Sequence, residues 1–228
     1  MEELEPHLKC GRLERGFLRV SSLYRLNRGD TQGALEGIER AVQFDPNGAL
    51  TLAGAATVYN AIGRTDDGRA AVDRAMLVAP DNITINVFGA VLATDAATAE
   101  RFARNVERLA PEQGVWGLMS AAAVYRRFGK DAEAEAALDR YAELADAQGV
   151  GDADWAQYYL LGRNDLEATY ERLEKAVVKY ERGEGDPGFV PLVARFLNPA
   201  ARGVAPDPRL AEPRFQRLFD RLRALTQQ

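Results

Sequence analysis

One phrase occurs twice in this chain at a fixed distance, and it restricts the possible folds more than any other feature. GDTQGALEGIERAVQFDPNG begins at Gly29, and GRTDDGRAAVDRAMLVAPDN begins at Gly63, 34 residues later. The same offset relates Pro46 to Pro80. Repeats of about 20 to 50 residues are typical of arrays in which each unit packs against its neighbours. The sequence therefore predicts a repeat array, in which function belongs to a surface more often than to a catalytic centre.

Apolar residues recur at helical spacing within both copies of the phrase and before them. Across residues 13–26 they lie three or four positions apart, which predicts one helix. Gly29 is expected to end this helix, and Asp30 or Thr31 to cap the next one. The second helix should stop before Pro46, because proline cannot continue a helix. Each copy thus predicts a pair of helices.

The later units keep this design with local changes. The second unit, residues 49–82, offers Thr65 as a favourable N-cap for its second helix. The third unit is shorter, because the Ala-Pro pair ending at Pro80 recurs as a pair ending at Pro111, an offset of 31 residues. We place the missing residues at a tighter turn over residues 93–95.

The repeats and their decay divide the chain into successive parts. We expect a lead-in over residues 1–14, four repeats over 15–48, 49–82, 83–113 and 114–148, a degenerate fifth helix pair over 149–182, and an irregular segment with a closing helix over 183–228. The closing helix should begin near Pro213, since proline fits the first turn of a helix. Its expected apolar stripe consists of Phe215, Leu218, Phe219 and Leu222.

The repeated part resembles the tetratricopeptide repeat (TPR) family. Its motif has apolar, small and tyrosine positions on the first helix, and alanine, aliphatic and proline positions on the second. The second unit carries it as Leu52, Ala55, Ala56 and Tyr59, then Gly68, Val72, Ala75 and Pro80. The resemblance implies an all-α fold, an alpha-alpha superhelix of antiparallel helix pairs with a C-terminal capping helix.

The tail carries a second, narrower resemblance. Leu160-Leu161-Gly162 and the later Glu212-Pro213-Arg214-Phe215 are similar to the closing segments of repeat arrays in bacterial adenylate or guanylate cyclases, winged-helix regulators and serine/threonine kinases. This resemblance implies a non-catalytic protein-interaction module, the sensory or regulatory part of a bacterial signalling protein. The alternative is a small-molecule receptor that uses the same groove as a pocket.

TPR arrays usually bind their partners in a concave groove lined by the first helices. The residues that the resemblance places there are Arg19, Leu23, Thr57, Asn60, Thr84, Val91, Trp116, Met119, Arg126 and Arg127. Such a groove is apolar in its middle and has arginines toward its ends, which suits a short helix or extended peptide with acidic flanks. In the alternative interpretation, Trp116 and Met119 are core residues between adjacent repeats.

Composition excludes several classes of function. The net charge of −5 argues against general nucleic-acid binding, which needs a basic surface. The chain has one cysteine, Cys10, and one histidine, His7, so neither a cysteine zinc site nor a nucleophile–histidine pair with histidine support can be assembled. We therefore expect no catalytic residues, no metal and no cofactor, and we interpret the chain as not an enzyme.

Three charged or glycine-rich patterns have simpler explanations than a site. Residues 183–188 match G-x-G-x-x-G, but a predicted helix precedes them where a dinucleotide site needs a strand. The acidic residues of the helix over 131–147 are expected to form a solvated face with Arg140; they are Glu133, Glu135, Asp139 and Glu143. The arginines of the closing helix should lie opposite its apolar stripe, as a polar cap or as a basic contact surface; they are Arg214, Arg217, Arg221 and Arg223.

No apolar run approaches the roughly 18 to 20 residues that span a bilayer, and the first residues do not resemble a signal segment. We expect a cytoplasmic location, with the periplasm as the alternative for a part of a membrane-anchored regulator. The partner is expected to be a protein or peptide, and neither nucleic acid nor membrane contact is predicted. The oligomeric state is left open by the sequence.

Overall fold

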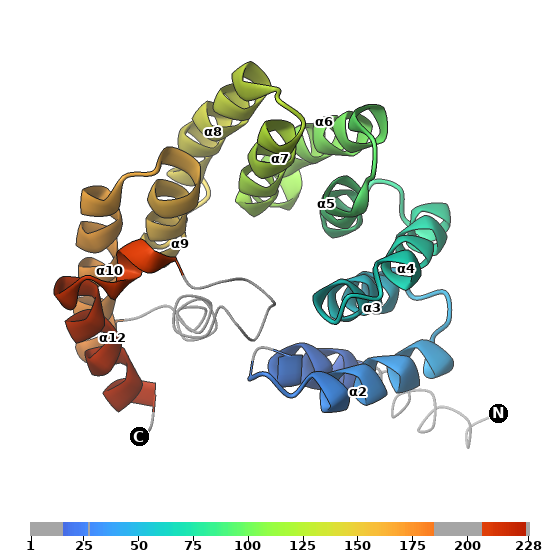
Figure 1. Ribbon diagram of the computed structural model, residues 1–228, viewed down its shortest axis with the longest axis horizontal. Coiled ribbons are helices and arrows are strands. Elements are labelled where there is room, and N and C mark those ends of the chain that lie inside the picture. Colours follow the sequence, from blue (N-terminus) through green and yellow to red (C-terminus); the bar gives the residue numbers. More distant parts are fainter. Residues whose placement is uncertain (1–15, 27, 185–206, 227–228) are drawn as a thin grey trace. The chain divides into compact units, whose positions relative to one another are not determined.

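The computed structural model describes residues 16–26, 28–184 and 207–226, and every regular element in them is helical (Figure 1). Most of the helices form antiparallel pairs, so the predicted all-α fold of helix pairs is confirmed. By internal contacts the chain divides into two compact units, with the boundary between Leu109 and Ala110. The predicted division into individual repeats stays a prediction.

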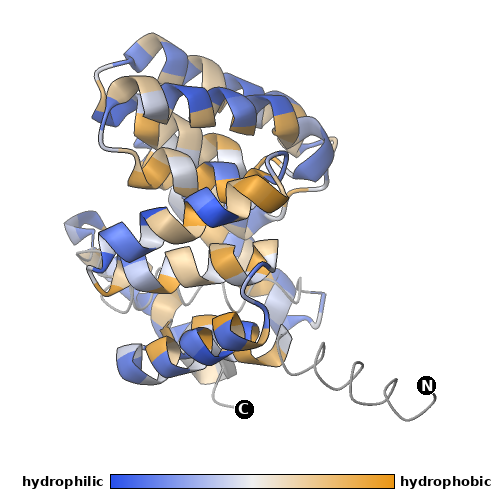
Figure 2. Ribbon diagram, turned by 90° about the vertical axis from the view of Figure 1, so that its right-hand side faces the viewer, coloured by the Kyte–Doolittle hydropathy of each residue, from blue (hydrophilic) through white to orange (hydrophobic). Residues whose placement is uncertain are grey.

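The first unit begins with a helix over residues 16–26. The helices that follow are α2 (Thr31–Phe44), α3 (Ala49–Ala61), α4 (Thr65–Val78), α5 (Ile83–Leu92) and most of α6 (Ala96–Gln113). Within this unit α2 packs on α3, α3 on α4, and α4 on α5. Figure 2 shows hydrophobic residues gathered between neighbouring helices and hydrophilic residues on their outer sides. This is the amphipathic pattern that drives helix pairing.

The second unit contains three helix pairs or partial pairs. Its elements are α7 (Trp116–Arg127), α8 (Asp131–Ala145), α9 (Asp152–Gln157), the π-helix η1 (Tyr158–Arg163), α10 (Leu166–Glu181), the 3-10 helix η3 (Pro208–Ala211) and α12 (Pro213–Thr226). α7 packs on α8, α9 on α10, and α12 on α10 (Figure 1). The closing helix therefore begins at Pro213, as predicted.

Caps and glycines set the helix ends of the first unit. Asp30 caps α2, where its Oδ1 accepts a hydrogen bond from the Gly33 amide at 2.9 Å. Gly29 and Gly63 have φ of 82° and 83°, a left-handed backbone that only glycine adopts without strain. The predictions for Gly29 and Asp30 are thus confirmed. They explain why the chain reverses at these points.

The predicted cap of α4 was wrong. Thr65 is the first helical residue, and Arg64 occupies the N-cap position without a side-chain cap bond. The Arg64 guanidinium instead donates to Asp67 at 2.6 Å and to Glu39 at 2.9 Å. Because Asp67 lies in the first turn with Asp66, the helix dipole supplies the stabilisation that a capping hydroxyl would otherwise give.

The residues by which the third unit is shorter are missing from its first helix and not from a turn. α5 has 10 residues whereas α3 has 13, and the connections after them, 62–64 and 93–95, are equally long. The prediction of a tighter turn at 93–95 was therefore wrong. Asp95 immediately precedes α6. Its Oδ1 accepts a hydrogen bond from the Thr98 amide at 2.8 Å, and this bond lowers the pKa of the Asp95 carboxyl.

Pro111 lies inside α6, whereas the equivalent Pro46 and Pro80 follow helix ends. A distant side chain caps the end of this helix. The amide of Gln148 donates to the Ala110 and Pro111 carbonyls, each at 3.1 Å, and its Oε1 accepts from the Val115 amide at 3.1 Å. A residue beyond α8 thereby fixes where α6 stops.

Small side chains form the tightest contacts of the first unit. The alanines at these positions are fully buried; they are Ala34, Ala41, Ala55, Ala56 and Ala75. Larger side chains such as Ile38 and Leu52 fill the space beside them. Small residues let helices approach closely, so any large side chain at these positions would force the pair apart.

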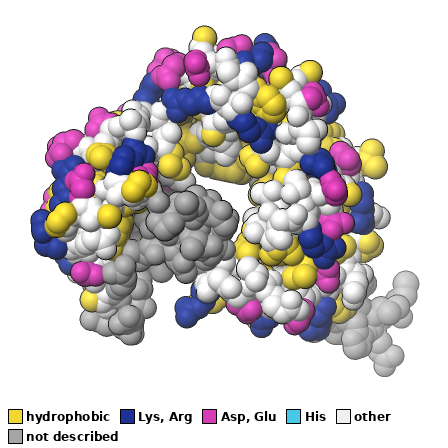
Figure 3. Space-filling model, in the orientation of Figure 1, with side chains coloured by type: hydrophobic (Ala, Val, Ile, Leu, Met, Phe, Trp, Pro, Cys, Tyr) yellow, Lys and Arg dark blue, Asp and Glu magenta, His cyan; other side chains and the backbone are white. Residues whose placement is uncertain are grey.

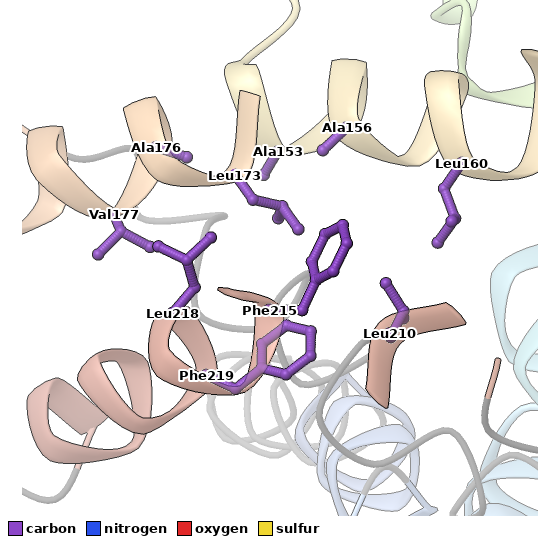
Figure 4. Packing of buried hydrophobic residues seen from close by; sticks show 10 residues of the cluster. All are labelled: Ala153, Ala156, Leu160, Leu173, Ala176, Val177, Leu210, Phe215, Leu218 and Phe219. Atoms are coloured by element: carbon purple, nitrogen blue, oxygen red, sulfur yellow. The ribbon is translucent and has the colours of Figure 1, made fainter. Parts of the chain in front are cut away.

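The second unit closes over an aromatic and aliphatic core (Figure 4). Phe215, Leu218 and Phe219 of α12 are buried against Leu173 and Val177 of α10. These three members of the predicted apolar stripe are confirmed as core. The fourth, Leu222, lies outside the described side chains.

Candidate functional site

The predicted groove residues of the first unit lie on its first helices, and most are half-buried. Arg19 belongs to the helix over residues 16–26, and its aliphatic stem packs over Gly54 of α3. The Thr57 hydroxyl donates to the Ala53 carbonyl at 3.0 Å, while Asn60 one turn later is exposed. The remaining predicted residues of this unit are half-buried; they are Leu23, Thr84 and Val91.

Trp116 is the clearest candidate contact in the second unit. Its side chain is 42% exposed at the start of α7, so the interpretation of Trp116 as core is wrong. The ring lies beside Gly114, whose left-handed backbone (φ 113°) ends the preceding turn. Met119 follows one helical turn later and is half-buried. The two side chains form an apolar stretch on α7, three residues apart.

The two arginines at the other end of α7 differ. Arg126 donates to Glu135 of α8 at 2.7 Å and to the Gly162 carbonyl of η1 at 2.9 Å. It therefore joins three elements of the second unit. Arg127 is exposed, and its guanidinium lies 4.6 Å from the centre of the Phe128 ring.

Three of the four predicted acidic residues of α8 pair with arginines, and Glu133 lies 3.6 Å from Lys130. Arg163 of η1 donates to Glu135 at 2.5 Å and to Asp139, and its Nε donates to the Tyr158 hydroxyl at 2.7 Å. Arg140 pairs with Glu143 at 3.0 Å, as predicted. The wider turn of η1 brings Arg163 into reach of α8, and sequence periodicity gave no signal for it.

Four aromatic rings pack where α8 meets α9 and η1. Tyr141 stacks on Tyr158 with centroids 4.9 Å apart, and Trp155 meets Tyr141 edge-on at 5.7 Å. Tyr159 lies beside Trp155 at 5.9 Å. Burial, and to a smaller extent the nearby Asp154 carboxylate, raises the pKa of Tyr141, which keeps its hydroxyl neutral. This cluster joins α8 to α9 and η1.

Asp152 is a buried carboxylate that three cations of α10 surround. Its side chain is 5% exposed, and it lies 2.9 Å from Arg172, 3.5 Å from Lys175 and 2.6 Å from Lys179. Burial by itself would raise the pKa of Asp152, but the hydrogen bonds from Lys179 and Arg172 outweigh it, so the pKa is lowered. The carboxylate therefore ties the start of α9 to α10.

This arrangement predicts a pH-dependent loss of stability. Because the folded-state pKa of Asp152 lies below the unfolded value, its contribution is present at neutral pH and is lost as the pH falls below the ordinary 3.8 through the lower folded value. Asp152→Asn should cost about 1–2 kcal/mol at pH 7, a modest figure because the lysines are half-exposed and screened.

Urea unfolding at several pH values checks this expectation. The difference between the parent and Asp152→Asn should shrink as the pH falls below the ordinary 3.8, because the carboxyl becomes protonated first in the unfolded chain and, at lower pH, in the folded chain. The exposed Asp146→Asn serves as the control and should leave stability unchanged. A difference that stays constant down to pH 2 would contradict the ion-pair explanation.

The sequence predicted that the arginines of α12 lie opposite its apolar stripe. In the structure not all of them do. Arg214 donates to Glu167 of α10 at 2.5 Å, and Arg221 donates to Glu181 of α10 at 2.7 Å. Both flank the buried stripe and hold α12 on α10. Arg217 is exposed, and the Arg223 side chain lies outside the described part.

Two concave spaces in the described part of the first unit are small. One of about 70 Å³ is lined by residues of α4, α5 and α6, including Val72, Leu92 and Phe102. Another, of about 150 Å³, lies between α2, α3 and α4 beside Tyr59 and Arg74. Pockets for drug-sized ligands usually have about 300 to 1,000 Å³. Neither space therefore favours the small-molecule receptor, which stays a prediction.

Other sequence candidates gain no support as sites. In the described ranges no three His, Cys, Asp or Glu side chains come together as a metal site would require. His7, Cys10 and residues 185–188 lie outside these ranges. A helix, α10, precedes Gly183, where a dinucleotide motif needs a strand. Among the described helices, none combines the length and apolar character needed to cross a bilayer.

Comparison with known proteins identifies the fold. No protein-family model matches this chain, and no curated protein matches it. Similar solved structures include the crystal structure of a thermophilic TPR protein from Thermus thermophilus, with 21% sequence identity and a TM-score of 0.54. The match covers 82% of this chain and 98% of that chain.

At this identity the similarity shows the fold alone. The described chain has a TPR-like all-α fold of paired antiparallel helices. The comparisons give no specific link to cyclases, winged-helix regulators or kinases.

Proposed function

We propose that this chain is a non-catalytic protein-interaction module that binds a peptide or partner domain through the exposed face of α7. The 42% exposure of Trp116 carries this proposal. An exposed tryptophan leaves a large apolar ring in water, and burying that ring against a partner is favourable. Tryptophan is among the residues that contribute most binding energy at interfaces. Trp116 and Met119 together supply an apolar anchor surface.

The charge at the far end of α7 defines the partner further. Arg127 is exposed and lies 11 residues after Trp116, about 16 Å along the helix. A ligand that covers both positions needs an apolar anchor residue and an acidic group about five residues away if it is extended. We therefore infer a short helix or extended peptide with an acidic flank, bound in the helix-in-groove or acidic-motif manner.

The first unit adds candidate contacts of its own. Asn60 is exposed, and Thr57 lies one turn before it on α3. We keep the other predicted residues of this unit as secondary contacts; they are Arg19, Leu23, Thr84 and Val91. Arg126 moves from the proposed contact set to the support of α7, because Glu135 and η1 engage it.

Peptide binding can be measured through Trp116 itself. Trp155 is 7% exposed, so Trp116 is the tryptophan whose emission should respond to a ligand. Peptides selected from a displayed random library should shift its emission to shorter wavelength on binding. Trp116→Ala should weaken binding of these peptides at least about tenfold, as expected for an interface residue worth more than 1 kcal/mol.

Two further variants make the test specific. Arg127→Glu should weaken acidic peptides and leave neutral ones unaffected. Leu77→Ala removes another exposed apolar side chain, on α4, and should change nothing. Full-strength binding by Trp116→Ala, with unaltered circular dichroism, would exclude the α7 face.

We also propose that the module is the sensory or regulatory part of a bacterial signalling protein. The resemblance of the tail around Glu212-Pro213-Arg214-Phe215 supports this role. In the described part, these residues begin the helix that closes the second unit. The reading frame and its genomic neighbours test the proposal, because a cyclase, kinase or DNA-binding domain encoded with the module is its expected consequence.

A further inference from the structure

The helix over residues 16–26 carries an apolar stripe that the first unit leaves uncovered. Phe17, Val20 and Tyr24 are 71%, 55% and 60% exposed, and they lie three and four positions apart on one helical face. The other large exposed apolar residues of the described part occur singly or side by side in sequence; they are Phe44, Leu50, Leu77, Val78, Trp116 and Leu161.

The 34-residue offset shows how the same face is used in the next helix pairs. The equivalents of Phe17, Val20 and Tyr24 are Thr51, Gly54 and Val58 on α3, then Ile85, Phe88 and Leu92 on α5. All three positions on α3 are buried. On α5, Ile85 and Leu92 are buried and Phe88 is half-buried. The face is therefore covered in each later pair.

The covering side chains come from the preceding helix pair in both cases. A methyl group placed on Gly54 would lie 3.0 Å from Cγ of Arg19 and 3.2 Å from Cδ1 of Ile38. A methyl group on Gly68 of α4 would lie 3.3 Å from Cδ1 of Leu92. The stripe formed by Phe17, Val20 and Tyr24 is thus the stacking face of the first pair, with nothing from the described chain stacked on it.

We propose that a second copy of this chain covers the stacking face, in a symmetric dimer whose two copies of the helix over residues 16–26 pack antiparallel. Among the described side chains of α12, several exposed ones are unsuited to covering an apolar stripe. The exposed residues of α12 include Gln216, Arg217 and Asp220, which are polar. A stacking face is self-complementary, because apolar side chains at helical spacing fit between their own copies.

Charge and register fix the antiparallel orientation. Centring the two-fold axis between Val20 and Ser21 places Tyr24 of each copy opposite Phe17 of the other. Arg28 donates to the Tyr24 hydroxyl at 3.3 Å and so lies at one end of the stripe. Antiparallel packing places the two Arg28 side chains at opposite ends of the paired stripes, whereas parallel packing would bring like charges together.

The experiment measures molecular mass in solution. Two such stripes bury less than the standard interface of about 1,600 Å², so the dimer should be weak and best observed at about 100 µM chain. Light scattering after gel filtration should give twice the chain mass of 25.0 kDa at high concentration and fall toward 25.0 kDa on dilution. Val20→Glu should be a monomer throughout with unchanged far-ultraviolet circular dichroism.

Leu77→Glu is the matched control, because it places the same charge on another exposed apolar position, and it should remain a dimer. A cross-link covers the case in which Val20→Glu does not fold. Cys10→Ser with Val20→Cys should form an interchain disulfide on oxidation, and Cys10→Ser with Leu77→Cys should not. A parent chain that is monomeric at every concentration, or a Val20→Cys variant that fails to cross-link, overturns the proposal.

Discussion

Ala75→Arg is expected to lower the free energy of unfolding by about 3–5 kcal/mol. This is the largest effect that we expect from a single substitution at a buried position of the first unit. Ala75 is completely buried on α4, in the contact between close-packed helices. An arginine there must either bury its charge or push the helices apart. Either outcome costs several kcal/mol, because desolvation and overpacking both act.

Urea unfolding followed by circular dichroism measures this loss, and Ala70→Arg provides its control. Ala70 lies on the same helix and is exposed, so the same substitution should stay within about 0.5 kcal/mol of the parent. Hydrogen exchange should show that amides of α3 and α4 lose protection before those of α10, since repeat arrays lose stability locally first. Equal melting of Ala75→Arg and the parent would show that Ala75 is not a close contact.

Phe215→Ala is expected to cost about 3–5 kcal/mol and to release α12 from α10. Phe215 is fully buried, and its ring lies 5.6 Å from that of Tyr170 and 6.4 Å from that of Phe219 (Figure 4). Removing the ring leaves a cavity at the centre of this cluster. The ion pairs of Arg214 and Arg221 with α10 are partly exposed and cannot compensate.

Hydrogen exchange and limited proteolysis measure the release of α12. Amides of residues 213–226 should lose protection in Phe215→Ala while α3 and α4 keep theirs. Arg217→Ala alters an exposed residue two positions away and should leave the helix protected. Protection of α12 that is unchanged in Phe215→Ala would contradict its role as the anchor of the closing helix.

The distribution of charged side chains on the surface bears on which class of partner is expected. Figure 3 shows positive and negative side chains interspersed on the face in view, without one large region of a single sign. This distribution agrees with the argument from net charge against general nucleic-acid binding. Specific recognition therefore depends on individual exposed side chains such as Trp116, and the expected partner is a peptide or protein.

Sequence reasoning located the helices well because local signals determined them. The 34-residue offset, the glycines Gly29 and Gly63, and the cap Asp30 all act within a few residues of their own position. The buried alanines were also identifiable, because small residues recur at the same register in each copy. A TPR-like all-α fold could be predicted from these signals without knowledge of any long-range contact.

Some features of the structure depend on long-range contacts that local sequence signals do not indicate. α6 runs through Pro111, which local rules treat as a helix breaker, and Gln148 caps its end from beyond α8. The π-turn of η1 brings Arg163 and the carbonyl of Gly162 to residues of α7 and α8. That network engages Arg126, one of the predicted contact residues, in hydrogen bonds that no spacing pattern indicates.

The sequence by itself determined the helical repeat and its small-residue contacts, because each depends on residue type and local spacing. Only the tertiary structure decided which side chains are exposed. It left Trp116 and the stripe of Phe17, Val20 and Tyr24 in solvent, while it covered the equivalents of that stripe on α3 and α5. The physical reason is that exposure depends on which helix packs next, and that neighbour is distant in sequence.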